Sequence, residues 1–198
     1  MMDDKTAWPA LDLLSPPARA AAEANADTAY ARLVVRGDGW PPARAMLSAL
    51  RPESLLTAPV RSAGDANALL AGLWLWLNWL DESHTISQAI ETPTGSFWHA
   101  ILHRREGDFS NAKYWYARCR HHPALAAVAA AGRTVVDRTT GQRLEGLVRG
   151  EWDPSAFVDV VEAIHDKPGD PLYPTAVALQ RAEWKALFDH CVHEAAGR

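Results

Sequence analysis

The pattern of apolar and polar positions predicts helices along most of the chain. The Ala-rich stretch 18–35, which also carries Arg and Glu, has a strong helix-forming composition, and 36–39 is expected to end it. A second, shorter helix is expected at 40–50. A third, at 66–80 with Asp65 as its cap, is apolar around its whole circumference, which predicts a central buried helix. The alternation of Leu and Trp within it also fits a buried strand, but its length favours a helix.

A helical hairpin is predicted in the middle of the chain, on either side of Gly107. Its first helix is expected to follow the break at TPTGS, with Ser96 as the cap, and to end at Glu106. Asp108 is expected to cap the second helix. The apolar side chains of that helix recur on one face, at Phe109, Ala112, Tyr116 and Cys119.

The last third of the chain is less regular. Residues 133–152 show no clear period, and both a loop and a short β excursion at TVV and LVR are compatible with them. Helices are expected again at 153–166 and 175–194. The pattern therefore predicts an all-α fold, a single-domain helical array over 1–198 with an irregular insertion at 133–152 as an open alternative.

Composition and charge narrow the classes of partner. A net charge of −4 and an isoelectric point near 6.0 give no general attraction to nucleic acid or to anionic membranes. The apolar run 68–77 is well short of the roughly 20 residues that span a bilayer. The start of the chain lacks the pattern of a signal peptide, and Cys119 and Cys191 are far apart, so a reducing cytoplasm is expected. The nine Trp are interpreted mainly as core residues.

Histidine and carboxylate side chains recur at helical spacing between residues 84 and 106. If 81–91 is helical, His84, Gln88 and Glu91 lie on one face at i, i+4 and i+7. A second set, His99, His103 and Glu106, repeats that spacing. Such a cluster is a plausible ligand set for zinc or another divalent metal, with His84, Glu91, His99 and His103 as ligands and Glu91 or Glu106 as ligand or base. The alternative is that the histidines form hydrogen bonds between packed helices.

A second interpretation of the same segment is a site for a small anionic or polar ligand. Arg104, Arg105 and Lys113 are expected near the helix N-terminus at Ser96, where free backbone N–H groups favour a phosphate or carboxylate. The complete candidate set for this pocket is His84, Gln88, Ser96, His99, His103, Arg104, Arg105 and Lys113. The alternative is that Arg104 or Arg105 forms an ion pair with Glu106 or Asp108.

Several common enzyme classes lack their motifs. The sequence contains no GxSxG, no GxxxxGK[ST] and no GxGxxG, and HAILH lacks the Glu of the HExxH zinc-protease motif. Cys119 falls on the apolar face of its helix, away from any evident catalytic partner. Nucleophilic hydrolases and nucleotide-binding folds of these classes are therefore not supported.

The hairpin resembles a tetratricopeptide-type unit in its small and aromatic positions, which are Gly107, Phe109, Ala112, Tyr116, Cys119 and Pro123. The sequence departs from that pattern at His103, where the repeat usually has an aromatic residue, and no second copy is evident. The resemblance implies a packed helix pair, with Arg104 or Arg105 on the ligand-facing side. A longer signature resembles that of a family of uncharacterised bacterial helical proteins, and it reads SHTISQ, TPTGSFWHAILHRREGDFSNAKYWY and EWKALFDHC. That family resemblance implies no mechanism.

Three functional hypotheses follow from the sequence. The first is a cytoplasmic protein whose polar pocket, between Ser83 and Lys113, binds a small anionic or polar molecule. The second is a metal-dependent enzyme that uses the His and Glu cluster. The third is a structural interaction module that binds a protein partner or a second copy of itself.

Overall fold

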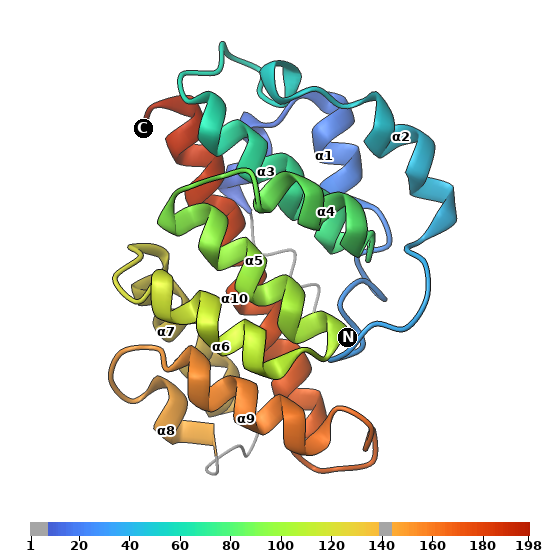
Figure 1. Cartoon of the computed structure of the whole chain (residues 1–198). Coiled ribbons are helices and arrows are strands. Elements are labelled where there is room, and N and C mark those ends of the chain that lie inside the picture. The colour runs from blue at the N-terminus through green and yellow to red at the C-terminus, as the bar shows by residue number, and fades with distance from the viewer. Residues whose placement is uncertain (1–7, 139–143) are drawn as a thin grey trace.

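The structure, a computed structural model, describes residues 8–138 and 144–198. Ten α-helices and no strand occur in these two ranges, which confirms the all-α prediction (Figure 1). The helices are α1 Pro16–Glu23, α2 Arg44–Ala49, α3 Ala63–Trp76, α4 Leu80–Ser87, α5 Pro93–Glu106, α6 Phe109–Arg118, α7 Ala124–Arg138, α8 Glu145–Val148, α9 Pro154–Ile164 and α10 Tyr173–Ala196. Short 3-10 helices occur at Pro9–Leu13, Pro41–Ala43 and Pro52–Ser54.

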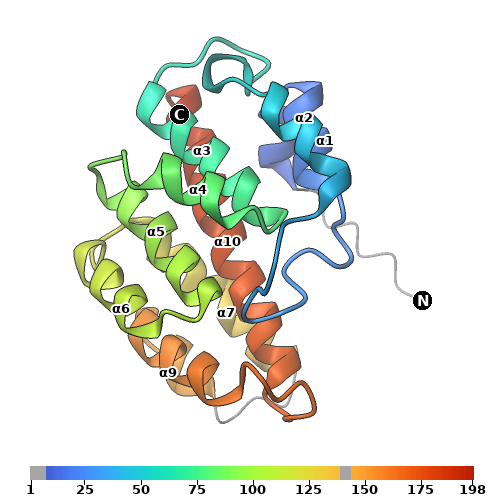
Figure 2. The ribbon, with the colours of Figure 1, turned by 45° about the vertical axis from the view of Figure 1, so that its right-hand side comes forward.

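Helix α10 is the central column of the fold and contacts both α3 and α7 (Figures 1 and 2). The ring of Trp184 on α10 is buried, lies 4.4 Å from the Trp76 ring and stacks on Phe188 at 4.5 Å between centroids. None of the nine Trp is exposed, and six of them are buried: Trp74, Trp76, Trp79, Trp98, Trp152 and Trp184. The excess of Trp therefore serves the core, because each buried indole removes roughly 150–250 Å² from water.

Helix α3 is central, as its all-round apolar pattern predicts. Ten of its residues are buried, from Ala66 to Trp76. Its cap is Ser62, whose hydroxyl accepts a hydrogen bond from the backbone N–H of Asp65, so the expectation that Asp65 itself is the cap was wrong. The helix also ends earlier than expected, because Asn78 adopts a left-handed conformation with φ of 64° and separates α3 from α4.

The first predicted helix, 18–35, is shorter than expected. Helix α1 ends at Glu23, after which Ala24 is extended and Asn25 is left-handed with φ of 55°. The chain from there to Val35 is not α-helical, but it places Ala29, Tyr30 and Leu33 in the core, where each is fully buried. Tertiary packing thus overrides the local helix propensity of this Ala-rich stretch.

The open segment 133–152 is largely helical where it is described. The TVV sequence lies inside α7, and Leu147 and Val148 lie in α8, so no β excursion occurs at either place. Residues 139–143 lie outside the described ranges. The physical reason for the helix is that α7 places a row of apolar side chains, including Val128 and Val136, in the core beside α10.

The predicted hairpin is formed by α5 and α6, which lie side by side (Figure 2). Gly107 ends α5 with φ of 88°, and the Asp108 carboxylate accepts from the N–H of Asn111, as expected. The cap of α5 is Thr92, not Ser96, which lies inside the helix. The similarity of this hairpin to a tetratricopeptide unit stays a prediction. None of the described helices is long and apolar enough to cross a bilayer.

Candidate metal centre and its surroundings

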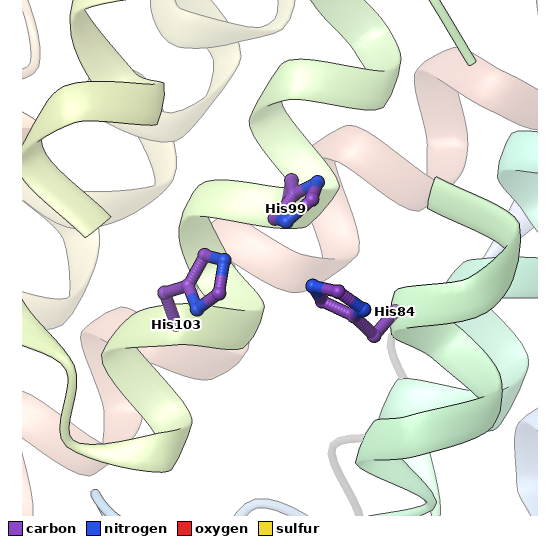
Figure 3. Close-up of side chains that lie close together, drawn as sticks. All are labelled: His84, His99 and His103. Carbon is purple, nitrogen blue, oxygen red and sulfur yellow. The ribbon is translucent and has the colours of Figure 1, made fainter. Parts of the chain in front are cut away.

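Three histidines converge between α4 and α5 (Figure 3). His84 comes from α4, while His99 and His103 come from successive turns of α5 and so share one face of that helix. One ring nitrogen from each lies within 4.8 Å of the other two. His99 and His103 are buried and His84 is partly buried, so the cluster sits at the edge of the core.

His99 is the least satisfied member of the trio. Its ring stacks on Trp115 of α6, with 4.2 Å between centroids and 12° between planes. Its Nδ1 atom is buried and has no hydrogen-bond partner. Burial, together with the neighbouring His103 and His84, lowers the pKa of His99 from 6.5 to about 4. The ring is therefore neutral at pH 7, which is the form that binds a metal ion.

His103 is held by a hydrogen bond at each ring nitrogen. Its Nδ1 lies 2.9 Å from Oε2 of Glu106, and its Nε2 lies 3.1 Å from the Asn111 amide nitrogen. Because a carboxylate only accepts, Nδ1 carries the proton, and Nε2 accepts from the Asn111 amide. A carboxylate that orients a histidine through Nδ1 is common behind metal ligands. The Asn111 amide would have to turn aside to let an ion reach Nε2.

The geometry of the trio suits one small ion after a modest adjustment. Zn²⁺ binds imidazole nitrogens at about 2.0–2.1 Å, so two nitrogens on one tetrahedral ion lie roughly 3.3 Å apart. The present separations of up to 4.8 Å require ring shifts of about an ångström. Three protein ligands leave a fourth position for water or substrate, as in catalytic zinc sites.

Glu91 does not join the trio, contrary to the expectation from its spacing. Helix α4 ends at Ser87 and Gln88 is its C-cap, so the face that was expected to continue to Glu91 is interrupted. The chain then turns toward the cap of α5 at Thr92, and Glu91 is exposed. The error arose from the helix boundary, because the i, i+7 relation requires one continuous helix.

A pocket of about 720 Å³ lies next to the trio. Trp115 lines this pocket and also stacks on His99, so a single ring joins the two features. Gln88 and Ser96, both expected to bind a ligand, line it together with Glu91. These three side chains make no hydrogen bond with the part of the chain that the structure describes. We name this feature the α4–α5 pocket.

Arg104 points away from the trio into the core and is 0% exposed. Its Nη2 lies 2.6 Å from Oε2 of Glu183 on α10, and its Nη1 donates to the Tyr116 hydroxyl. Tyr116 in turn donates to Glu183 Oε1 at 3.0 Å. Burial would lower the pKa of Arg104, but the Glu183 carboxylate outweighs it and the pKa is raised. The ion-pair partner is thus Glu183, not Glu106 or Asp108 as the sequence suggested.

Arg105 is also fully buried, on the side of α5 that faces the 24–35 segment. Its Nη1 donates to the Arg32 carbonyl at 2.8 Å and to Oε1 of Gln180 at 3.2 Å. Its Nη2 donates to Asn78, and the guanidinium lies 3.7 Å above the Tyr30 ring. Burial lowers the pKa of Arg105 to about 10, so it stays charged at pH 7. An anion could reach either arginine only by replacing these protein contacts.

The remaining candidate, Lys113, lies on α6 and forms an ion pair with Asp159 of α9 at the surface. The structure therefore divides the eight expected ligand residues among the trio, the α4–α5 pocket, the core and a surface ion pair. Two neighbours of the trio, Asn111 and Trp115, were not expected at the site. Their i, i+4 spacing on α6, on a different face from Ala112 and Tyr116, is the sequence signal that pointed to them.

A second pair of histidines lies elsewhere in the fold. The rings of His122 and His190 are 4.6 Å apart, and neither belongs to the trio. Comparison with protein-family models, with curated proteins and with solved structures finds no match. The function must accordingly be argued from the geometry of the site.

Proposed function

We propose that this protein binds a divalent transition-metal ion, with Zn²⁺ as the best fit, through His84, His99 and His103. The observation that carries the proposal is the convergence of three ring nitrogens within 4.8 Å, one histidine of which has a buried nitrogen without a partner. A buried polar atom without a hydrogen bond costs free energy, and coordination of an ion by Nδ1 of His99 would remove that cost. Imidazole is a preferred ligand of zinc.

The proposed centre has the composition of a catalytic zinc site. Three neutral imidazoles leave one coordination position for water, and a zinc-bound water has a pKa near 7. Glu106 would then act through His103, by fixing the position of its proton, and not as a direct ligand. The α4–α5 pocket lies beside the trio and would admit a polar substrate. Metal-dependent hydrolysis is the activity that this arrangement supports best.

The first experiment is to measure the metal content of protein purified without a His tag or chelator. About one Zn²⁺ per chain is expected, together with a fall in melting temperature on addition of EDTA. His99→Phe keeps an aromatic ring against Trp115 but removes the ligand nitrogen, so it should lose the metal while staying folded. His190→Ala is the control, since it removes a histidine outside the trio and should retain the metal. Full metal retention in His99→Phe would refute the proposal.

A second candidate function is the binding of a small polar molecule in the α4–α5 pocket. It is favoured by Gln88, Glu91 and Ser96, which line the pocket with side chains that form no hydrogen bond to the described residues. A screen of small polar compounds by thermal shift tests it, with Ser96→Val as the variant that should abolish any stabilisation. If a compound stabilises both proteins equally, it binds elsewhere.

A protein-interaction role has less support from the surface. Tyr114, 57% exposed, is the one large hydrophobic side chain among the described residues that is open to solvent. A single exposed ring offers little apolar area for a stable protein interface or a homo-oligomer.

A further inference from the structure

A second pocket, of about 390 Å³, lies where the end of α6 leads into α7, at the same open end of the hairpin, and shares no residue with the α4–α5 pocket. It is formed where the turn after α6 meets the start of α7 and the segment after α8. Arg120 and His121 come from the turn, Arg133 from α7, and Glu151 and Trp152 from the segment before α9. We name it the α7 pocket.

Two arginines in the α7 pocket keep most of their hydrogen-bonding capacity. The exposed side chain of Arg120 forms no hydrogen bond or ion pair with the described residues. Arg133 uses Nη1 for a bond of 3.1 Å to the Val148 carbonyl and leaves the rest of its guanidinium free within the same described ranges. Glu151 is the one carboxylate in the lining. This differs from the core arginines, whose charges are met by protein groups.

The positive character of the pocket comes from the arginines and from the helix end, not from His122. The His122 Nδ1 accepts from the Ala124 N–H at 3.1 Å, and its Nε2 lies 3.1 Å from the Thr94 hydroxyl. Burial, with His190 nearby, lowers the pKa of His122 to about 4, so the ring is neutral at pH 7. Ala126 in the first turn of the 15-residue α7 also lines the pocket, where the helix dipole is positive.

The other walls of the α7 pocket are apolar. Leu125 and Ala129 of α7 face it from one side, and the buried Trp152 from another. Guanidinium groups match the two oxygens of a carboxylate or phosphate, while an apolar wall favours a hydrocarbon or aromatic group on the same molecule. The volume falls in the range of small-molecule sites, which is about 300–1,000 Å³.

We propose that the α7 pocket binds a small organic oxyanion, an apolar group that carries a phosphate or a carboxylate, through Arg120 and Arg133. This site is independent of the proposed metal centre, because it uses other helices and no residue of the trio. It also differs from the anion site that the sequence suggested at Arg104, Arg105 and Lys113.

Isothermal titration of the full chain with phenyl phosphate tests the proposal. The Arg120→Ala variant should bind at least about tenfold more weakly, since a charge-assisted bidentate contact is lost. Glu151→Gln should bind more tightly, because it removes the one repelling carboxylate of the lining. Arg149→Ala is the matched control: it makes the same change in net charge next to Gly150 of the lining, but Arg149 forms an ion pair with Glu145 and does not line the pocket.

The outcomes separate a built site from general charge attraction. Unchanged affinity in Arg120→Ala overturns the proposal. The fold of this variant should be intact, because the Arg120 side chain is exposed and forms no hydrogen bond or ion pair with the described residues. An equal loss in Arg149→Ala also overturns it, since binding would then follow net charge alone. Inorganic phosphate and phenol should each bind more weakly than phenyl phosphate, and equal binding of inorganic phosphate would remove the apolar part of the claim. Titration with benzoate distinguishes a carboxylate ligand from a phosphate ligand. Tighter binding of benzoate than of phenyl phosphate indicates a carboxylate, and the reverse indicates a phosphate.

Discussion

Helix α5 carries a pair of arginines on one face and a pair of histidines on another. The two pairs differ in how many hydrogen-bond and ion-pair partners the protein provides for them. Arg104 and Arg105 face the core, where a carboxylate, carbonyls, a side-chain amide and aromatic rings meet their charge. His99, one turn earlier on the face toward α4, has a buried nitrogen with no partner. In the sequence all of these residues stand within HAILHRR.

The presence or absence of protein partners separates a structural polar cluster from a ligand site. A buried charge that lies beside protein partners is explained by the fold itself, even though Nε of Arg104 and Nε of Arg105 form no hydrogen bond with the described residues. A buried imidazole whose Nδ1 has no such partner, and which lies beside two further imidazoles, indicates a missing ligand. On this criterion the arginines hold the helices together and the histidines are the candidate site.

Removing the carboxylate of the core cluster should cause the largest loss. Glu183→Ala leaves the Arg104 charge buried without its partner, and this should lower the free energy of unfolding by about 3–5 kcal/mol in urea denaturation. The double variant Arg104→Met with Glu183→Leu removes both charges and should be much more stable than the single one. If the double variant is as unstable as Glu183→Ala, the loss of stability comes from the missing hydrogen bonds among these side chains and not from the unpaired charge.

Adding metal should stabilise the histidine cluster and leave the arginine cluster unaffected. At a free Zn²⁺ concentration about 100 times the dissociation constant, the wild-type chain should gain about 2.7 kcal/mol of stability. His99→Phe should gain nothing, and this is measured as the shift in melting temperature. The same shift in both proteins would place the zinc outside the trio.

Acid should destabilise the metal-free protein through its buried histidines. The folded-state pKa of His99 is about 4 and the ordinary value is 6.5, so between these values the unfolded state binds the extra proton. Stability is therefore constant above pH 6.5 with respect to this group and falls as the pH drops toward 4, by at most about 1.4 kcal/mol per pH unit for one proton. Urea denaturation at several pH values should show a smaller slope for His99→Phe than for the wild type, and equal slopes would contradict the assignment.

The smallest effect is expected at Asn111. Its amide donates to Nε2 of His103, and a hydrogen bond of this kind contributes about 0.5–1.5 kcal/mol. Asn111→Ala removes this competitor, so Zn²⁺ should bind roughly 2- to 10-fold more tightly in a competition titration with a chromophoric chelator. Weaker binding would show instead that Asn111 helps to hold the ion.

Local rules were sufficient for much of the fold. The stop at Gly107 and the cap at Asp108 depend on a few adjacent residues, and both were predicted. The central position of α3 followed from its all-round apolar pattern. The meeting of His84 with His99 and His103 was also expected, because α4 and α5 are joined by a short turn.

Long-range partners could not be predicted from the same information. Nothing near Arg104 in the sequence identifies Glu183 as its partner, so the core role of the arginines was not distinguishable from anion binding. The early end of α1 has the same origin, because the carbonyls of Tyr30 and Arg32 accept hydrogen bonds from Gln180. Glu91 was misplaced because a helix end shifted by a few residues changes which side chains share a face.

The contacts of α10 have a consequence for synthesis of the chain on the ribosome. Gln180 binds the Tyr30 carbonyl across 150 residues of sequence, and Trp184 donates to the Gly72 carbonyl across 112. Because α10 follows every other described helix, these contacts cannot form until translation has passed all of them. The apolar side chains of earlier segments rich in Trp and Leu therefore stay exposed to solvent until α10 has been synthesised. We expect chaperones to bind the nascent chain during this time.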